Sequence, residues 1–220
     1  MAFDLTQRAF ERFYMSLVYI AHGNHEYSRL FLDLGFKLCD DASAADLICF
    51  TGGADVSPSF YGDLKHRTTH NDLWRDENEK HLFETALEYS IPMVGICRGG
   101  QFLNVMSGGR MYQDVTGHTR SHSITDKFTG EVVYVSSTHH QMIMPSERCE
   151  IVATSTDVHS KREWYDQEVF RHDETDEGIE VVYYPTTNAL CFQPHPEFKS
   201  VEYVGMQKYF RSLLKRYLEI

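Results

Sequence analysis

Residues 91–101, which read Ile-Pro-Met-Val-Gly-Ile-Cys-Arg-Gly-Gly-Gln, decide how this chain folds. The first four of them are apolar and suit a short β-strand, and residues 102–106 are apolar at helical spacing. Gly95 and Gly99 stand two positions before and two positions after Cys97. The sequence therefore predicts a strand, a sharp turn at Cys97 and a helix.

The predicted turn would both expose and activate Cys97. Small residues on either side allow such an elbow to form, and the elbow pushes the side chain between them out from the strand end. The thiol would then lie at a helix N-terminus, where unpaired N–H groups favour an anion. A helix N-terminus and a nearby imidazolium can lower a thiol pKa by roughly one to several units. The alternative is a buried core cysteine, but a core position would not require glycines on both sides, so Cys97 is a candidate nucleophile.

Short apolar segments alternate with helical patterns through the first half of the chain. The expected elements are strands at residues 17–21, 36–38, 46–51 and 91–94 and helices at residues 5–14, 26–34, 76–89 and 102–106. Asp76 and Glu79 form a capping box that would open the third of these helices. This alternation predicts an α/β fold with an open, mostly parallel sheet and helices on both faces.

Beyond residue 110 the predicted strands become shorter and indicate a small antiparallel β addition. They are expected at residues 132–135, 149–153, 179–184 and 189–192, before a last helix at residues 199–218. Residues 155–178 are polar and end in an acidic run. We interpret this stretch as a solvated loop rather than as a segment that binds a partner.

Length and composition exclude several classes of protein. A chain of 220 residues predicts one domain spanning residues 1–220, with residues 1–15 as an N-terminal helical extension. The net charge of −11 argues against a nucleic-acid partner. No apolar run approaches the roughly 20 residues of a membrane span, and the N-terminus does not resemble a signal peptide.

The five cysteines are widely spaced, without a Cys-x-x-Cys pair, which indicates a reducing compartment and a cytoplasmic protein. Four of them lie in or beside apolar runs and are interpreted as core residues, namely Cys39, Cys49, Cys149 and Cys191.

Two other segments carry candidate site residues. Gly52 and Gly53 follow the strand predicted at residues 46–51, where bare backbone N–H groups can point into the crevice that binds ligands in such sheets. Far along the chain, residues 193–197 read Gln-Pro-His-Pro-Glu. In an extended segment, side chains two positions apart share one side. His195 and Glu197 would therefore provide a base for a cysteine nucleophile and a carboxylate that orients the base.

Taken together, these motifs resemble those of class I glutamine amidotransferases. The resemblance extends to the branch of that family that hydrolyses γ-glutamyl amides, including γ-glutamyl-γ-aminobutyrate. Further matches to that branch are Arg75-Asp76-x-x-Glu79, Asn104-Val105-x-x-Gly108-Gly109, Gln113-Asp114, His118-x-x-x-His122, His139-His140-Gln141 and Gly178-Ile179-Glu180. The resemblance implies the flavodoxin-like fold of that family. The chain departs from the branch at Ser136, where an Asn is usual.

The resemblance also implies a role for each matching residue. Cys97 would attack the γ-carbonyl of a glutamyl group to form a thioester, and His195 and Glu197 would complete a catalytic triad. Backbone N–H groups around Gly53 and of Arg98 would form the oxyanion hole. The glutamyl end would be held by Gly52, Gln101, His139, His140 and Gln141. No metal or organic cofactor is expected, because the many histidines do not suggest a ligand set beside the triad.

Three functions follow as alternatives. The first is a hydrolase that cleaves γ-glutamyl amides, either glutamine or γ-glutamyl amines, and releases glutamate. The second is a glutaminase subunit that passes ammonia to a separate synthetase or ligase chain. The third is a non-catalytic binding protein on the same fold, which the intact Cys97, His195 and Glu197 argue against. Other thiol enzymes with an elbow on an open sheet are a weaker alternative, because they need not carry a late His-Pro-Glu.

Overall fold

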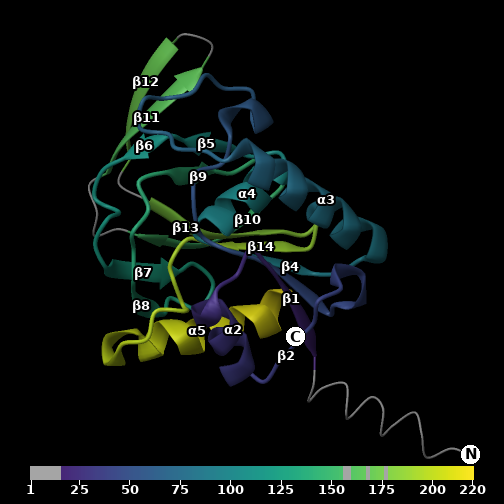
Figure 1. The fold of residues 1–220 in the computed structure, drawn as a ribbon. Helices are drawn as coiled ribbons and strands as arrows, with labels where there is room; N and C mark the ends of the chain where they lie inside the picture. The colour runs from purple at the N-terminus through teal and green to yellow at the C-terminus, as the bar shows by residue number, and fades with distance from the viewer. Residues whose placement is uncertain (1–15, 156–159, 167–168, 176–177) are drawn as a thin grey trace, which may run out of the picture.

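A nine-stranded mixed sheet forms the centre of the molecule (Figure 1). The structure, a computed structural model, describes residues 16–155, 160–166, 169–175 and 178–220. Five neighbouring strands of the sheet run parallel, in the order β2-β1-β3-β4-β14. Their bounds are Lys37–Leu38 for β2, Leu17–Ala21 for β1, Leu47–Phe50 for β3, Met93–Ile96 for β4 and Ala189–Phe192 for β14.

The same sheet continues through four antiparallel strands in the order β13-β10-β7-β8. These are Gly178–Tyr184, Glu150–Ser155, His122–Asp126 and Val132–Val135. Two smaller ladders lie beside it. One pairs β5 (Arg110–Tyr112) with β9 (Met142–Met144), and the other joins β6 (Asp114–Val115), β11 (Ser160–Asp166) and β12 (Val169–Thr175).

Helices cover both faces of the sheet, as Figure 1 shows. On one face, α2 (His25–Asp33) and α5 (Val204–Tyr217) contribute to a single apolar cluster. On the other, α3 (Leu73–Tyr89) and α4 (Arg98–Met106) contribute to a second. Strands β3 and β4 contribute side chains to both clusters, which is why their sequences are apolar without alternation. The predicted fold class, an α/β fold with helices on both faces, is confirmed.

Helix α3 begins earlier than predicted, at Leu73, as does α4, at Arg98. The side chain of Asp72 accepts a hydrogen bond from the Arg75 N–H and caps α3, so the expected capping box of Asp76 and Glu79 is wrong. Both residues lie inside the helix and are buried. Their carboxylates are bound by a cation from α4 rather than by the N-terminus of their own helix.

The segment predicted as a solvated loop is also different. Strands β11 and β12 form an antiparallel hairpin within it, with Lys161 opposite Glu174 and Arg162 opposite Asp173. The polar composition of this segment is therefore not a sign that strands are absent.

Two of the cysteines interpreted as core residues, Cys39 and Cys149, are only half-buried, whereas Cys49 and Cys191 are buried. The helix predicted at residues 5–14 lies outside the described residues. Among the helices the structure describes, none combines the length and the apolar character needed to cross a bilayer.

Candidate active site

The elbow forms where β4 meets α4, and Cys97 is its strained residue. Its φ of 52° and ψ of −112° lie in a region that side-chain-bearing residues rarely adopt. The two flanking glycines allow the backbone of the elbow to pass very close to neighbouring backbone atoms. A Cβ on Gly95 would lie 2.3 Å from the backbone oxygen of Gly99, and a Cβ on Gly99 would lie 2.1 Å from the backbone oxygen of Phe50. The chain therefore needs glycine at both positions to place Cys97 at the start of the helix.

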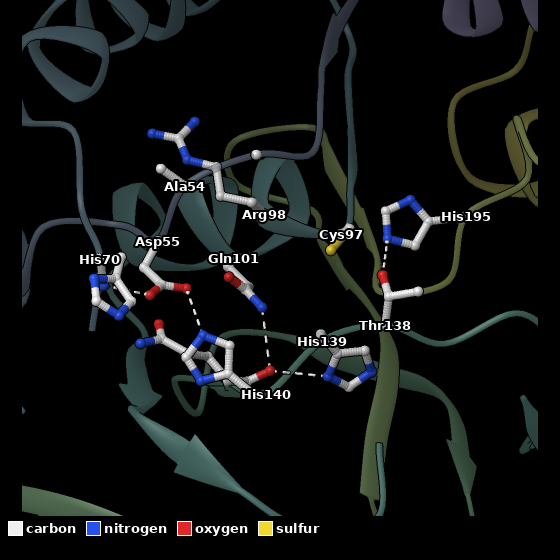
Figure 2. Close-up of a pocket in the computed structure, with 12 residues that line it drawn as sticks. Ala54, Asp55, His70, Cys97, Arg98, Gln101, Thr138, His139, His140 and His195 are labelled. Carbon is white, nitrogen blue, oxygen red and sulfur yellow. Dashed lines mark hydrogen bonds and ion pairs between the residues drawn. The ribbon is translucent and has the colours of Figure 1, made fainter. Parts of the chain in front are cut away.

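The topology brings His195 to this elbow from almost a hundred residues away. Strand β14 pairs in parallel with β4, with Phe192 opposite Ile96, so the residues that follow both strands emerge at the same sheet edge. The Cys97 N–H also donates to the Phe192 carbonyl at 2.8 Å. Figure 2 shows the Cys97 and His195 side chains beside each other at the wall of one pocket.

The imidazole of His195 is oriented by a carboxylate. Its Nδ1 lies 2.7 Å from Oε1 of Glu197, and both side chains are buried. Burial opposes the charged imidazole, but the Cys97 sulfur and the Glu197 carboxylate outweigh it and raise the pKa of His195 to about 10. This arrangement favours an imidazolium beside Cys97. It places nucleophile, base and orienting carboxylate in the order that thiol chemistry needs.

The segment Ser136–Thr138 contacts both the main chain and the imidazole of His195. Ser136 Oγ donates to the His195 carbonyl and accepts from the His195 N–H, each at 3.1 Å. Thr138 Oγ1 lies 2.8 Å from Nε2 of the same imidazole (Figure 2). The sequence marks Ser136 only as a departure from the resembled branch and does not mark Thr138 at all, because their partner is distant in the chain.

The pocket at the elbow has a volume of about 300 Å³. Eight of the ten predicted site residues line it, namely Gly53, Cys97, Arg98, Gln101, His139, His140, Gln141 and His195. Glu197 stands behind His195. Gly52 lies behind the wall, since a Cβ there would come within 3.4 Å of His195 Cε1 and 3.7 Å of Cys97 Cβ. Its N–H donates to the hydroxyl of Tyr27 at 3.0 Å, so this donor already has a partner within the protein.

Arg75 fixes the glycine loop from outside the pocket. Its guanidinium donates to the carbonyl oxygens of Thr51, at 2.9 Å, and Gly52, at 3.0 Å. Gly53 has a φ of 147°, which favours glycine, and a Cβ there would lie 2.2 Å from Arg75 Nη1. With its carbonyls held by Arg75, the loop lines the pocket with bare backbone at Gly53.

The floor of the pocket is a set of interlocked side chains. The carbonyl of Gln141 accepts from Gln101 Nε2 at 3.1 Å and from His139 Nδ1 at 2.9 Å. The Gln141 side chain donates in turn to Thr69 Oγ1 at 3.0 Å. Because Gln101 comes from α4 and the other two from the segment before β9, these bonds hold two elements in register across the floor.

A charged group lies at the far end of the pocket from Cys97 (Figure 2). His140 Nε2 lies 3.2 Å from Oδ1 of Asp55, and the second carboxylate oxygen of Asp55 accepts from the His70 N–H at 2.7 Å. The hydrogen bond to Asp55, opposed by partial burial, raises the pKa of His140. Asp55 and His70 were not predicted as site residues, although Asp55 lies only two positions after Gly53.

The Arg98 side chain plays a structural part. It is buried, and its guanidinium forms ion pairs with both Asp76 and Glu79 of α3. Its backbone N–H follows the elbow directly and is the group to which the family resemblance gives a place in the oxyanion hole.

Among the described residues, one group brings metal-ligand types together. Ligand atoms of His118, His139 and Glu180 lie within 4.8 Å of one another, and all three residues are buried. However, Glu180 Oε1 accepts hydrogen bonds directly from His118 Nδ1 at 2.9 Å and from His122 Nε2 at 3.1 Å. Burial opposes the charge of this carboxyl, but the three imidazoles outweigh it and hold the pKa of Glu180 well below its usual range. We interpret the cluster as a buried hydrogen-bond network under the pocket.

A family model described as Peptidase C26 matches residues 37–197. A glutamine amidotransferase-like protein of Lactococcus lactis subsp. lactis is 40% identical, over 44% of this chain and 50% of that protein. The carbamoyl phosphate synthase small chain of Ralstonia nicotianae is 31% identical, over 50% of this chain and 26% of that one. The matches thus take in half or less of each of these relatives.

Solved structures share the fold at low sequence identity. A glutamine amidotransferase from Thermotoga maritima has a TM-score of 0.58 and 17% identity, covering 92% of this chain and 85% of that one. The PurLQS structure from Thermotoga maritima has a TM-score of 0.59 and 18% identity, covering 92% of this chain and 98% of that one. At this identity the likeness bears on the fold alone.

Proposed function

We propose that this chain, which belongs to the peptidase C26 family of class I glutamine amidotransferase-like proteins, is a cysteine hydrolase that cleaves γ-glutamyl amide bonds. The observation that carries the proposal is that Cys97 and His195 meet at the pocket wall, with Glu197 bound to His195 from behind. A strained elbow, an imidazole beside it and a buried carboxylate on the far imidazole nitrogen are the parts that acyl transfer through sulfur requires.

In the proposed acylation, the Cys97 proton passes to Nε2 of His195 and the thiolate attacks the γ-carbonyl carbon. The carbon–sulfur bond forms as the carbonyl electrons move to oxygen. Backbone N–H groups of Gly53 and Arg98 would stabilise that oxyanion, an effect of roughly 3–4 kcal/mol per donor in other hydrolases. When the oxyanion collapses, the carbon–nitrogen bond breaks. The leaving amine takes the proton from Nε2, and a glutamyl thioester remains on Cys97.

Deacylation reverses the proton path. Water attacks the thioester carbonyl while giving a proton to Nε2, and the carbon–sulfur bond breaks with its electrons going to sulfur. Glutamate leaves, and the Cys97 sulfur takes the proton back from Nε2. His195 thereby acts first as acid towards the amine and then as base towards water. Glu197 keeps Nδ1 protonated and aligned through both steps.

The remaining pocket residues would recognise the amino-acid end of the glutamyl group. Gln101, His139 and Gln141 provide amide and imidazole groups on the floor. At the far end, His140 and Asp55 offer a cationic and an anionic side chain, which complement an α-carboxylate and an α-ammonium. Five free cysteines support the cytosolic location proposed for the enzyme.

A second candidate function is a glutaminase subunit that supplies ammonia to a synthetase or ligase chain. It is favoured by the relative named as a carbamoyl phosphate synthase small chain and by the fold shared with PurLQS. The chemistry at Cys97 would be the same, and only the fate of the amine would differ.

Turnover assays separate these functions. The protein alone is incubated with glutamine and with a panel of γ-glutamyl amines, and the released glutamate is quantified. We expect γ-glutamyl amines to be hydrolysed without a partner, and Cys97→Ser to abolish turnover while the circular dichroism spectrum stays unchanged. The matched control is Cys149→Ser, a half-buried thiol outside the pocket, which should keep full activity.

Other results of these assays would favour one of the alternative functions or reject Cys97 as the nucleophile. Slow glutamine turnover that rises only with an added synthetase chain would favour the subunit role. Turnover by Cys97→Ser near the wild-type rate would reject the nucleophile. A complete absence of turnover, together with no labelling of Cys97 by a glutamine-like alkylating reagent, would leave the non-catalytic binding protein as the answer.

A further inference from the structure

The hydroxyl of Thr138 contacts the atom of His195 that handles the proton. Its Oγ1 lies 2.8 Å from Nε2, while Nδ1 of the same ring is taken by Glu197. Figure 2 shows Thr138 joined to the His195 imidazole by this contact, with the Cys97 side chain beside the same ring. Thr138 lines the pocket and is exposed to it, so a group entering the pocket meets this hydroxyl and Nε2 together.

The segment that carries Thr138 is fixed to its surroundings by the two residues before it. Ser136 is bonded twice to the main chain of His195, and Ser137 Oγ donates to the carbonyl of His118. Immediately after Thr138, His139 is tied to the Gln141 carbonyl on the pocket floor. The contact between Thr138 and the imidazole therefore joins two parts that are already held together by other bonds.

A hydroxyl suits Nε2 in both of its protonation states, because it is both a donor and an acceptor. When His195 is neutral, Nε2 carries a lone pair and the Thr138 O–H can donate to it. When His195 has taken the Cys97 proton, Nε2–H can donate and Oγ1 accepts. A methyl group in the same place could do neither.

From this geometry we propose that Thr138 is a catalytic residue, whose hydroxyl stabilises the His195 imidazolium and holds Nε2 towards the leaving amine and the attacking water. The inference rests on the proposed function in so far as it takes Cys97 and His195 as the reacting pair. No atom is gained or lost at Thr138, since the proton that moves is the one exchanged among Cys97, Nε2 and the amine or water.

Few side chains among the described residues face the His195 imidazole and can influence its pKa. Glu197 bonds Nδ1, the Cys97 sulfur stands on the Nε2 side, and the Phe198 ring stacks on the imidazole at a centroid distance of 4.6 Å. The phenol of Tyr27 lies behind Gly52, and burial, with the Glu197 charge adding to it, raises the Tyr27 pKa, so the phenol stays neutral. Thr138 is thus an uncharged partner of His195. A substitution of Thr138 would leave the charged groups around the imidazole in place.

The test compares Thr138→Val, which keeps the shape without the hydroxyl, with Thr138→Ser, which keeps the hydroxyl. The titration of His195 is followed by nuclear magnetic resonance of its imidazole, assigned by its loss in His195→Gln. Because an acceptor on Nε2 favours the charged ring, its removal should lower the His195 pKa. We expect a fall of about half a unit to one unit in Thr138→Val, given the usual strength of hydrogen bonds to charged groups.

Kinetics provide the second readout. In Thr138→Val we expect kcat to fall about tenfold with little change in KM, because the hydroxyl acts on the reacting nitrogen. The alkaline midpoint of the kcat/KM profile should move down with the His195 pKa, and Thr138→Ser should restore both. The control is Thr85→Val on α3, whose hydroxyl donates only to the carbonyl of its own helix residue His81. It should match the wild type.

The outcomes distinguish this inference from the proposed function. An unchanged His195 titration in a folded Thr138→Val protein would overturn the role of Thr138. So would a Thr138→Ser protein that titrates and turns over like the valine variant. If no γ-glutamyl amide is hydrolysed but the imidazole titration still shifts as expected, the contact stands and the proposed function fails.

Discussion

At the scale of single residues, the elbow depends on the absence of two methyl groups. The Cβ of an alanine at Gly99 would lie 2.1 Å from the Phe50 carbonyl oxygen, a backbone atom that cannot rotate away. The cost of such overpacking is typically about 1–3 kcal/mol and can exceed that where backbone is involved. The strain at Cys97 is thus maintained by the close contact between α4 and β3.

We predict that Gly99→Ala lowers the free energy of unfolding by about 2–3 kcal/mol and displaces Cys97, with loss of turnover. Urea unfolding at neutral pH gives the first quantity and an activity assay the second. Gly205→Ala is the matched control, because it stands in α5 and its added Cβ would face open space beyond its own helix turn. That variant should be as stable as the wild type or more so. A Gly99→Ala protein with wild-type stability would show that the contact at the elbow is looser than described.

Residue patterns in the sequence predicted the triad of this site, but not every residue that contacts it or completes the pocket. Cys97 is marked by its flanking glycines, and His195 with Glu197 by their spacing in an extended, proline-flanked segment. Thr138 and His70 carry no such local mark. Each becomes a candidate site residue only through a partner far away in the sequence, such as the imidazole 57 residues beyond Thr138.

At the scale of elements, α3 is joined to the elbow helix by ion pairs rather than by apolar contact alone. Arg98 of α4 binds both Asp76 and Glu79, all three being buried. The second oxygen of Asp76 accepts from the Ser57 N–H at 2.8 Å, so the same carboxylate also holds the loop after β3. Breaking a buried ion pair by removing one partner commonly costs about 3–5 kcal/mol.

We therefore predict that Asp76→Asn destabilises the protein by about 3 kcal/mol or more, since the new amide must face either the guanidinium or the Ser57 N–H with a donor of its own. Chemical denaturation measures the change. Asp33→Asn, which breaks the exposed pair with Lys199, is the control and should unfold close to the wild type. Equal stability of the two variants would mean that the Arg98 ion pairs are not what fastens α3 to α4.

The element boundaries show where reasoning from the sequence stops. Asp76 and Glu79 have the spacing of a capping box, but that spacing also serves two carboxylates one turn apart that face a single buried arginine. Only the position of Arg98, 19 residues after Glu79, decides between the two. Similarly, the hairpin of β11 and β12 is stabilised by pairing between strands, which a polar sequence does not reveal before its register is known.

At the scale of the whole molecule, function follows from strand order. The parallel strands and the positions of the helices on both faces could be predicted from the apolar runs and their spacing. Their lateral order could not, because strands β4 and β14 are neighbours in space but are separated by most of the second half of the chain. That adjacency brings the thiol and the imidazole to one sheet edge, and the motif resemblance anticipated it without explaining it.

The antiparallel half of the sheet has its own part in the site. Glu180 of β13, with His118 and with His122 of β7, forms the buried network beneath the pocket, and His139 reaches it with Nε2 3.5 Å from the Glu180 carboxylate. The segment before β9 that carries Thr138 and His139 is thereby anchored to the sheet. The antiparallel half of the sheet thus holds in place the segment between β8 and β9 that lines the pocket.

The most direct test of the central claim is to trap the acyl-enzyme. The protein is mixed with a γ-glutamyl amide, quenched in acid within one turnover, and analysed by intact mass and by peptide mapping. We predict one glutamyl group attached through a thioester to Cys97 and none in Cys97→Ser. Turnover without any adduct on Cys97, or a glutamyl group found on a different residue, would contradict the account.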